Sequence, residues 1–268
     1  MLIPDNIEEF NSRGEELLFI KFKNDSTAKN YFVLHSVFTN FHLKKSSGEL
    51  DFFVLVPGHG FFAIEVKHGK VRREGGTWYH EDKHGKVSKN SAGPFFQVSG
   101  TMNSIRQYIL RKVSHNPVLR SRLEKILFGN GVAFTSMDIL PDIGPECFTW
   151  QVLSRAHLKL PISSYVNTLS SGWHSEHRGK VWYDGNYSRP SVEDCKTVIS
   201  ILRGDFEVDY SEINKIVDHE HLIEEYTKEQ FRLLDFVNYN RRCLVQGAAG
   251  TGKTLLAKAV AGEAQVSF

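Results

Sequence analysis

Two acidic residues and a lysine are the side chains best placed to do chemistry in this chain of 268 residues. Asp51 opens the apolar run DFFVLV, and Glu65 and Lys67 stand two residues apart in the following run, FFAIEVK. The turn signal PGHG joins the two runs, so they are expected to form a hairpin. Because side chains alternate along a strand, Glu65 and Lys67 share one side, and Asp51 can meet them at one end of the sheet.

This set of groups suits metal-assisted hydrolysis of a phosphodiester bond. Mg²⁺ prefers oxygen ligands at about 2.0–2.1 Å and usually keeps several waters. We therefore expect Asp51, Glu65 and the backbone carbonyl of Val66 to hold Mg²⁺ or Mn²⁺, with positions left for water and phosphate. Lys67 could orient or deprotonate the attacking water, or hold the scissile phosphate, and the sequence leaves these roles open.

An earlier segment supplies a third acidic side chain. Leu18, Phe19 and Phe22 follow helical spacing within a helix expected over residues 7–23. Glu15 lies three and four residues before Leu18 and Phe19, so it is expected to face the buried side, in preference to its neighbour Glu16. It would complete the acidic cluster.

A second motif with chemical meaning lies at residues 247–254, GAAGTGKT. It follows the apolar segment CLV and opens the helical segment TLLAKAVAGEA, which is the strand–loop–helix context of a phosphate-binding loop. Backbone N–H groups and the helix dipole would bind the phosphates of ATP. The residues assigned to this site are Gly247, Gly250 and Gly252 for the turn, Lys253 for the β- and γ-phosphates, and Thr254 for Mg²⁺.

Strand and helix signals alternate along the chain and predict an α/β fold. The strands are expected at 31–37, 51–56, 61–67, 77–80, 131–136 and 147–154. A helix is expected from Phe95 or Gln97 to about Val113. Another is expected over 191–204, with Ser191 as its N-cap and Gly204 at its end.

The overall composition is that of an ordinary soluble globular protein, with 41% hydrophobic and 24% charged residues. No apolar run approaches the ~18–20 residues that span a bilayer, and the N-terminus has no secretory signal pattern. The three cysteines, Cys147, Cys195 and Cys243, lie far apart, which argues against a disulfide framework and favours a reducing cytoplasm.

Charge is unevenly distributed along the chain. Residues 66–89 contain seven Lys/Arg against three Asp/Glu, and residues 101–125 contain six against one. Residues 204–229 reverse the balance, with nine acidic residues against two lysines. The basic stretches are either solvated helix faces or a surface for a polyanion followed by an acidic connector.

Several of these pieces together resemble the nuclease-related domain (NERD), a branch of the PD-(D/E)xK restriction-endonuclease-like superfamily. The matching segments are SRGEELLF, GELDFFVLV, FFAIEVKHG, Trp78 and GPFFQVSGTMNSI. The resemblance implies a mixed central sheet flanked by helices in a domain over 1–203, with a core at about 10–130 and an extension over 131–203. It also implies DNA as substrate and a functional set of Glu15, Asp51, Glu65, Lys67 and Gln97. Helix capping or packing is the alternative role for Gln97.

The C-terminal part resembles the start of a UvrD-like superfamily 1 helicase, through LIEEYTKEQFRLLDFVNYNRRCLVQGAAGTGKTLLAKAV. That resemblance implies an acidic linker at 204–226, an incomplete ATPase segment at 227–268, and contact of Gln230 with adenine. The later helicase motifs do not follow, so the chain is expected to be the front portion of a nuclease–helicase. ATP hydrolysis is not expected from these residues alone.

Three functions follow from these readings. The first is a Mg²⁺-dependent DNA nuclease working with a helicase in DNA repair or defence. The second is a module of nuclease fold that binds DNA or a partner without cutting it. The third is a free-standing nucleotide binder, which the missing downstream motifs oppose. The set Asp51, Glu65 and Lys67 favours the first, because a scaffold has no need of such a cluster.

Overall fold

A computed structural model of the chain describes residues 1–7, 9–39, 48–81, 85, 87–138 and 143–204, together with positions 244, 246, 253, 254, 257 and 261. Contacts between Cα atoms divide the chain into a unit of residues 1–205 and a unit of residues 206–268. The six isolated positions belong to the second unit, and all helices and strands named below belong to the first. Within the described residues, no helix is long and apolar enough to cross a membrane.

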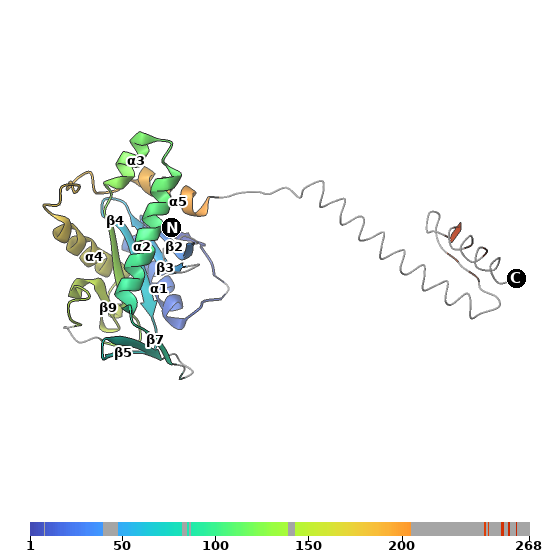
Figure 1. The fold of residues 1–268 in the computed structure, drawn as a ribbon, viewed down its shortest axis with the longest axis horizontal. Coiled ribbons are helices and arrows are strands. Elements are labelled where there is room, and N and C mark those ends of the chain that lie inside the picture. Colours follow the sequence, from blue (N-terminus) through green and yellow to red (C-terminus); the bar gives the residue numbers. More distant parts are fainter. Residues whose placement is uncertain are drawn as a thin grey trace. The chain divides into compact units, whose positions relative to one another are not determined.

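A six-stranded mixed sheet forms the centre of the first unit, in the order β1–β2–β3–β4–β8–β9 (Figure 1). β2, β3 and β4 pair antiparallel, whereas β1 joins β2, β8 joins β4, and β9 joins β8 in parallel. The strands are β1 (Leu2–Ile3), β2 (Phe32–Thr39), β3 (Gly48–Val56), β4 (Gly60–Lys67), β8 (Phe128–Phe134) and β9 (Val152–Ser154). The observed mixed sheet confirms the expected α/β class.

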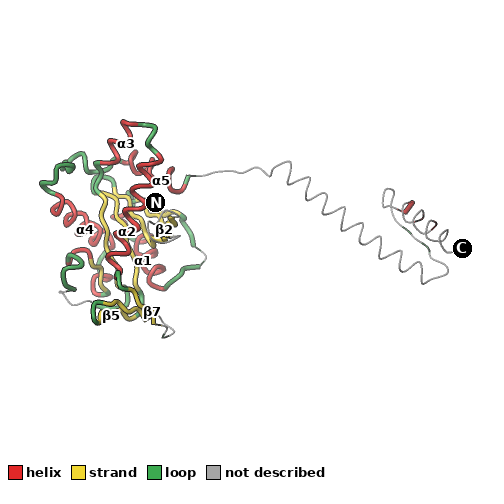
Figure 2. The backbone as a smooth tube through the Cα atoms, in the orientation of Figure 1, coloured by secondary structure: helices red, strands yellow, loops and turns green. Residues whose placement is uncertain are grey.

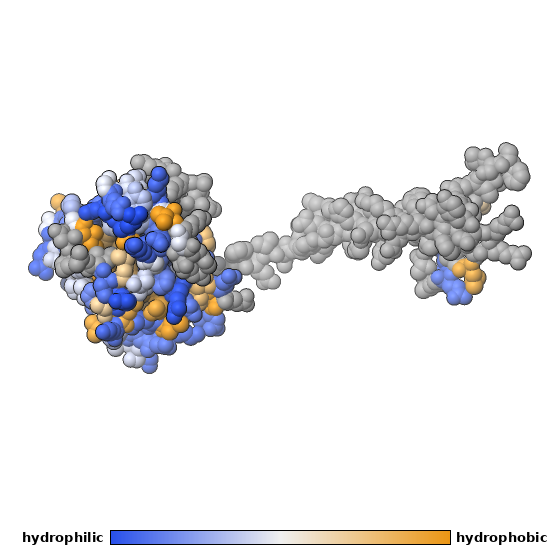
Figure 3. Space-filling view, turned by 90° about the horizontal axis from the view of Figure 1, so that it is seen from below, coloured by the Kyte–Doolittle hydropathy of each residue, from blue (hydrophilic) through white to orange (hydrophobic). Residues whose placement is uncertain are grey.

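A second, three-stranded antiparallel sheet follows β4 in the chain. It comprises β5 (Lys70–Glu74), β6 (Thr77–Glu81) and β7 (Val87–Asn90). Cross-strand partners share a face, so Val71, His80 and Ser88 form one row, and Arg72, Tyr79 and Lys89 form the next row on the opposite face. Viewed from the side of this sheet, the surface of the first unit is mostly hydrophilic, with small hydrophobic areas between (Figure 3).

Helices cover both faces of the central sheet. The helices are α1 (Arg13–Asn24), α2 (Gly93–Lys112), α3 (Pro117–Glu124), α4 (Ile162–His177) and α5 (Val192–Arg203). Apolar side chains of α2, α3 and α5 pack on one face, and those of α1 and α4 pack on the other. Figure 2 shows α2 lying across the strands. The core is therefore two apolar layers, one on each side of a sheet whose central strands are buried throughout.

The first helix begins later than its apolar pattern indicates. We expected it near Ile7, but α1 begins at Arg13, because the Ser12 side chain accepts a hydrogen bond from the Glu15 N–H and caps the helix there. Its apolar side chains Leu18, Phe19 and Phe22 are buried, as their spacing predicts.

Other expected elements are confirmed with shifted bounds or corrected. The expected strand at 147–154 is wrong over its first part, where Thr149–Gln151 forms a 3₁₀ turn closed by a hydrogen bond from the Phe148 N–H to Gln151 Oε1 at 2.8 Å. Only Val152–Ser154 pairs as a strand. The helix expected over 191–204 is confirmed as α5, with Ser191 as its N-cap.

The start of α2 depends on one glycine. Gly93 has a φ of +68°, a conformation that favours glycine, and Pro94 follows it in the first turn. A Cβ atom at Gly93 would lie 2.6 Å from Nε1 of Trp78. Glycine is thus required here both by the backbone conformation and by the close approach of β6. The turn at Gly93 brings Gln97 of α2 toward the end of β4.

Candidate active site

The site begins where two central strands separate. The β3–β4 ladder runs to the pair Phe52–Ile64, while β3 stays paired with β2 as far as Gly48. Beyond that pair, the Asp51 carboxylate replaces the missing ladder partner. Its Oδ2 atom accepts a hydrogen bond of 2.6 Å from the Val66 N–H. The separation of the strands therefore opens a gap whose edge carries Asp51.

Glu65 lies in this gap and is almost entirely buried, with 3% of its surface exposed. Its Oε1 atom accepts hydrogen bonds from Nζ of Lys67 at 2.7 Å and from Nε2 of Gln97 at 2.8 Å. Its Oε2 atom is buried and has no hydrogen-bond partner among the residues that the structure describes. Since a buried carboxylate oxygen without a partner costs free energy, this atom is a candidate ligand for a cation.

The electrostatics of the three charged groups point the same way. Burial raises the pKa of Asp51 well above its usual range, and the charge of Glu65 adds to the rise. Burial also raises the pKa of Glu65, although Lys67 opposes that change. Burial alone would lower the pKa of Lys67, but attraction to Glu65, together with that to Asp51 and Glu15, outweighs it and the pKa rises. One cation, Lys67, thus faces two buried carboxylates. A further positive charge in the gap would therefore be electrostatically favourable.

The donors present fit a hard divalent cation. Asp51 and Glu65 offer carboxylate oxygens, including the unpartnered Oε2. The N–H and C=O of one strand residue point to the same side, so the Val66 carbonyl faces the gap as its N–H does. No group of three His, Cys, Asp or Glu side chains able to hold a metal occurs within the described part of the chain. A set of two carboxylates, one carbonyl and water is one that Mg²⁺ accepts.

Glu15 is buried beside the site, as its helical phase predicts, but it has other partners. Its Oε1 atom accepts a hydrogen bond from Ser12 Oγ at 2.9 Å, and its Oε2 atom lies 3.1 Å from Nε2 of His35. It is close enough for its charge to raise the pKa of Asp51 and of Glu65. Glu15 therefore belongs to a buried pair with His35 and does not join the two carboxylates in a group of three.

His35 and Ser36 are residues of the site region that the sequence pattern did not reveal. The His35 ring is packed among Phe10, Phe19 and Phe52. Ser36 has a φ of +55°, and the β2–β3 register places it opposite Asp51. At this pair the alternation of side chains between the two faces of the sheet is interrupted in both strands. As a result, Leu34 and Val37 lie on the same face of the sheet. The sequence feature that could have indicated His35 is the presence of a histidine within an otherwise apolar strand segment.

An arginine from the end of the domain holds this kink in β2. Arg203, the last residue of α5, donates from Nη2 to the carbonyl oxygens of His35, at 2.9 Å, and of Ser36. His35 lies 168 positions before Arg203 in the sequence, so no local pattern could indicate the contact. The result is a direct link between α5 and the strand segment facing Asp51.

The structure describes only part of the expected phosphate loop. Lys253 and Thr254 are helical, with Thr254 exposed and Lys253 partly exposed. The remaining assigned positions, Gln230, Gly247, Gly250 and Gly252, lie outside the described residues. The nucleotide site at 247–254 therefore stays a prediction.

Comparison with known proteins identifies one region of the chain. Residues 11–127 match the family model of the nuclease-related domain, NERD. Searches among curated proteins and among solved structures found no match. The matched region contains Asp51, Glu65, Lys67 and Gln97, together with Glu15. The matched segment runs from α1 to α3 and ends just before β8, and this part of the chain is similar to a nuclease-related domain.

Proposed function

We propose that the first unit is a metal-dependent nuclease that hydrolyses phosphodiester bonds in DNA. The observation that carries the proposal is the buried Glu65 Oε2 atom without a hydrogen-bond partner, in a gap that also holds Asp51 and Lys67. The nuclease-related domain over residues 11–127 supports this reading. The arrangement is costly for folding, since two buried carboxylates lie near each other, and such a cost is typical of a functional site.

In this proposal, Asp51, Glu65 and the Val66 carbonyl hold Mg²⁺ or Mn²⁺. When bound, the ion supplies positive charge that lowers the pKa of a water and offsets negative charge at the phosphate. The water oxygen loses a proton to solvent and forms a bond to phosphorus, the bond from phosphorus to the leaving sugar oxygen breaks, and that oxygen takes a proton from solvent. The Val66 N–H holds Oδ2 of the Asp51 carboxylate at 2.6 Å, so that the other carboxylate oxygen keeps one orientation.

The role of Lys67 follows from its charge. Its contact with Glu65 raises its pKa in the absence of metal, so Lys67 brings a positive charge to the site. We therefore assign Lys67 to holding the scissile phosphate and stabilising its developing charge. Gln97 would keep Glu65 oriented through the hydrogen bond to Oε1.

The C-terminal region is proposed to bind ATP through the loop at 247–254, in a helicase-like segment joined to the nuclease by an acidic linker. The sequence context of strand, glycine-rich loop and helix supports this. Added ATP and Mg²⁺ should raise the thermal midpoint of the second unit, and Lys253→Ala should remove the rise. A midpoint equally raised in both proteins would contradict this assignment.

Cleavage of labelled DNA tests the nuclease proposal. The full chain is incubated with single- and double-stranded oligonucleotides in Mg²⁺, in Mn²⁺ and in EDTA, beside Glu65→Gln and Lys67→Ala. Glu176→Gln and Lys180→Ala serve as matched controls, because they change an exposed ion pair on and after α4. Metal-dependent cutting lost only in the first two variants is the expected result. Binding without cutting by all five proteins would instead indicate a module that positions DNA.

A further inference from the structure

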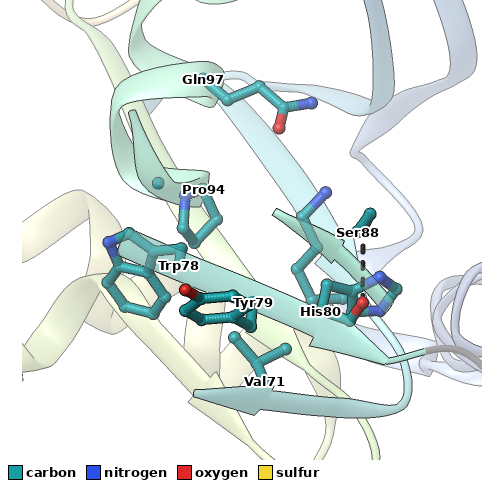
Figure 4. A pocket seen from close by; sticks show the side chains of 9 residues that line it. Val71, Trp78, Tyr79, His80, Ser88, Pro94 and Gln97 are labelled. Carbon is teal, nitrogen blue, oxygen red and sulfur yellow. Dashed lines mark hydrogen bonds between the residues drawn. The ribbon is translucent and has the colours of Figure 1, made fainter. Parts of the chain in front are cut away.

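A small cavity lies beside Lys67, between the start of α2 and the sheet β5–β6–β7. Its volume is about 110 Å³. Figure 4 shows Gln97 and Pro94 on one side and the residues of β5 and β6, among them Trp78 and His80, on the other. Because Lys67 and Gln97 line the cavity and also contact Glu65, the cavity opens directly next to the proposed catalytic groups.

The walls of the cavity combine flat apolar groups with polar ones. Trp78, Tyr79, Pro94 and Val71 supply the apolar surface, and Ser88 lies at its rim. Trp78 is fixed in place, since its Nε1 atom donates to Glu146 Oε2 at 2.9 Å. The His80 ring is fixed as well, through a hydrogen bond of 2.7 Å between its Nε2 atom and the His68 carbonyl.

Cations lie on the face of the small sheet opposite the row of Val71, His80 and Ser88. Arg72 lies over the Tyr79 ring, with its guanidinium carbon 4.7 Å from the ring centroid. Lys89 occupies the same cross-strand row as these two residues, and Lys70 lies on the same face of β5, two positions before Arg72. Such a mixture of aromatic rings and cations is typical of surfaces that bind single strands, where bases stack and phosphates pair with Lys or Arg.

We propose that this cavity receives one unpaired nucleobase of the DNA strand whose phosphate lies at Lys67. The proposal rests on the nuclease function argued above and adds its substrate class, which is single-stranded DNA or a frayed strand end. The size of the cavity carries this choice, because about 110 Å³ is well below the ~300–1,000 Å³ of pockets for drug-sized ligands. A base can enter such a cavity only when it is unpaired, since a base within a duplex must first leave its stack.

Two variants test the cavity without touching Glu65 or Lys67. Ser88→Phe would fill it from an exposed position on β7, and Tyr79→Ala would remove part of its wall. Val87→Phe is the matched control for Ser88→Phe, because Val87 is 50% exposed and points to the opposite face of the same sheet from Ser88. Thermal midpoints of all three are measured first, so that a folding defect in one variant leaves the other to decide.

The measurement is fluorescence anisotropy of a labelled oligothymidylate and of a blunt duplex, each titrated with the full chain in EDTA so that no cutting occurs. Ser88→Phe and Tyr79→Ala should each weaken single-strand binding about tenfold, the scale of one lost stacking contact. Duplex binding should change by less than about twofold, and Val87→Phe should match the wild type. Equal losses on both DNAs, or no loss in a folded variant, would overturn the proposal.

The outcome separates this proposal from the nuclease assignment. If the wild type cuts DNA with Mg²⁺ while Ser88→Phe binds and cuts single strands normally, the base pocket is refuted and the nuclease stands. If no protein cuts DNA but Ser88→Phe and Tyr79→Ala lose only single-strand binding, the pocket stands and the catalytic proposal fails.

Discussion

Lys67 Nζ lies 2.7 Å from Glu65 Oε1, and this contact occupies one oxygen of a carboxylate whose other oxygen is buried without a partner. The pair is not a simple buried ion pair, because Asp51 brings a second carboxylate to the same gap. A structural salt bridge would have its lone pairs satisfied. The excess of buried negative charge explains why a cation is expected here, and it leads to the following predictions.

The first prediction concerns stability and pH. The pKa of Asp51 is raised in the folded state, so the unfolded chain releases this proton at lower pH. Stability should therefore fall as pH rises from the unfolded pKa, about 4, up to the raised folded pKa. Asp51→Asn should remove this loss and raise the thermal midpoint at pH 7.5 by a few degrees without metal, with little effect at pH 4. Calorimetry at the two pH values checks it, with the exposed Asp5→Asn as control.

A second prediction concerns metal binding in the absence of DNA. An ion that binds only the folded state stabilises it by RT ln(1 + [L]/Kd), which is about 1.4 kcal/mol when the ion is present at ten times its Kd. Mg²⁺ or Mn²⁺ should thus raise the thermal midpoint of the wild type by a few degrees. Asp51→Asn and Glu65→Gln should abolish the rise. An undiminished rise in both variants would place the ion elsewhere.

The third prediction concerns Lys67. Attraction to Glu65 raises its pKa in the absence of metal, and we expect Lys67 to act as a fixed positive charge. Lys67→Ala should lower the cleavage rate about 100-fold or more, in line with loss of one group that stabilises the transition state. The pH dependence between about 6.5 and 9 should keep its shape. If the pH–rate profile of the wild type has a rising or falling limb that is absent in Lys67→Ala, Lys67 itself titrates during catalysis.

Much of the central hairpin could be predicted, because it depends on local patterns. The alternation in FFAIEVK placed Glu65 and Lys67 on one side of β4, and helical spacing turned Glu15 inward. The small basic strands β5 and β7 escaped prediction, since KVRRE and VSKN expose most of their residues and carry little apolar signal. α4 escaped as well, because its serines and glycine are weak helix formers whose burial comes from tertiary packing.

The kink in β2 could not be predicted for a different reason. Its cause is the contact of Ser36 and His35 with Arg203, which comes from the far end of the domain. Likewise, the partner of Glu15 is His35 on the neighbouring element, a choice that only the packed sheet determines. The spacing of residues in the sequence located the charged side chains. The tertiary structure determines which of them share a hydrogen bond.

That kink gives a fourth prediction. Arg203→Ala removes hydrogen bonds from a charged donor to two carbonyl groups, which should lower the free energy of unfolding by about 1–3 kcal/mol. It should also speed hydrogen exchange in β2 and slow DNA cleavage, because Ser36 faces Asp51. Arg203→Lys should restore part of each effect. Arg178→Ala, at an exposed position after α4, is the control. Unchanged exchange in β2 would show that the contact does not hold the strand.

The most direct test of the account is the single-turnover rate of DNA cleavage by the wild type and by Glu65→Gln, measured as Mg²⁺ is titrated against EDTA. We expect saturable cleavage by the wild type, none in EDTA, and a rate at least ~100-fold lower for Glu65→Gln at every Mg²⁺ concentration. Cleavage by Glu65→Gln at the wild-type rate would contradict it, since the carboxylate with the unpartnered oxygen would then have no part in the reaction.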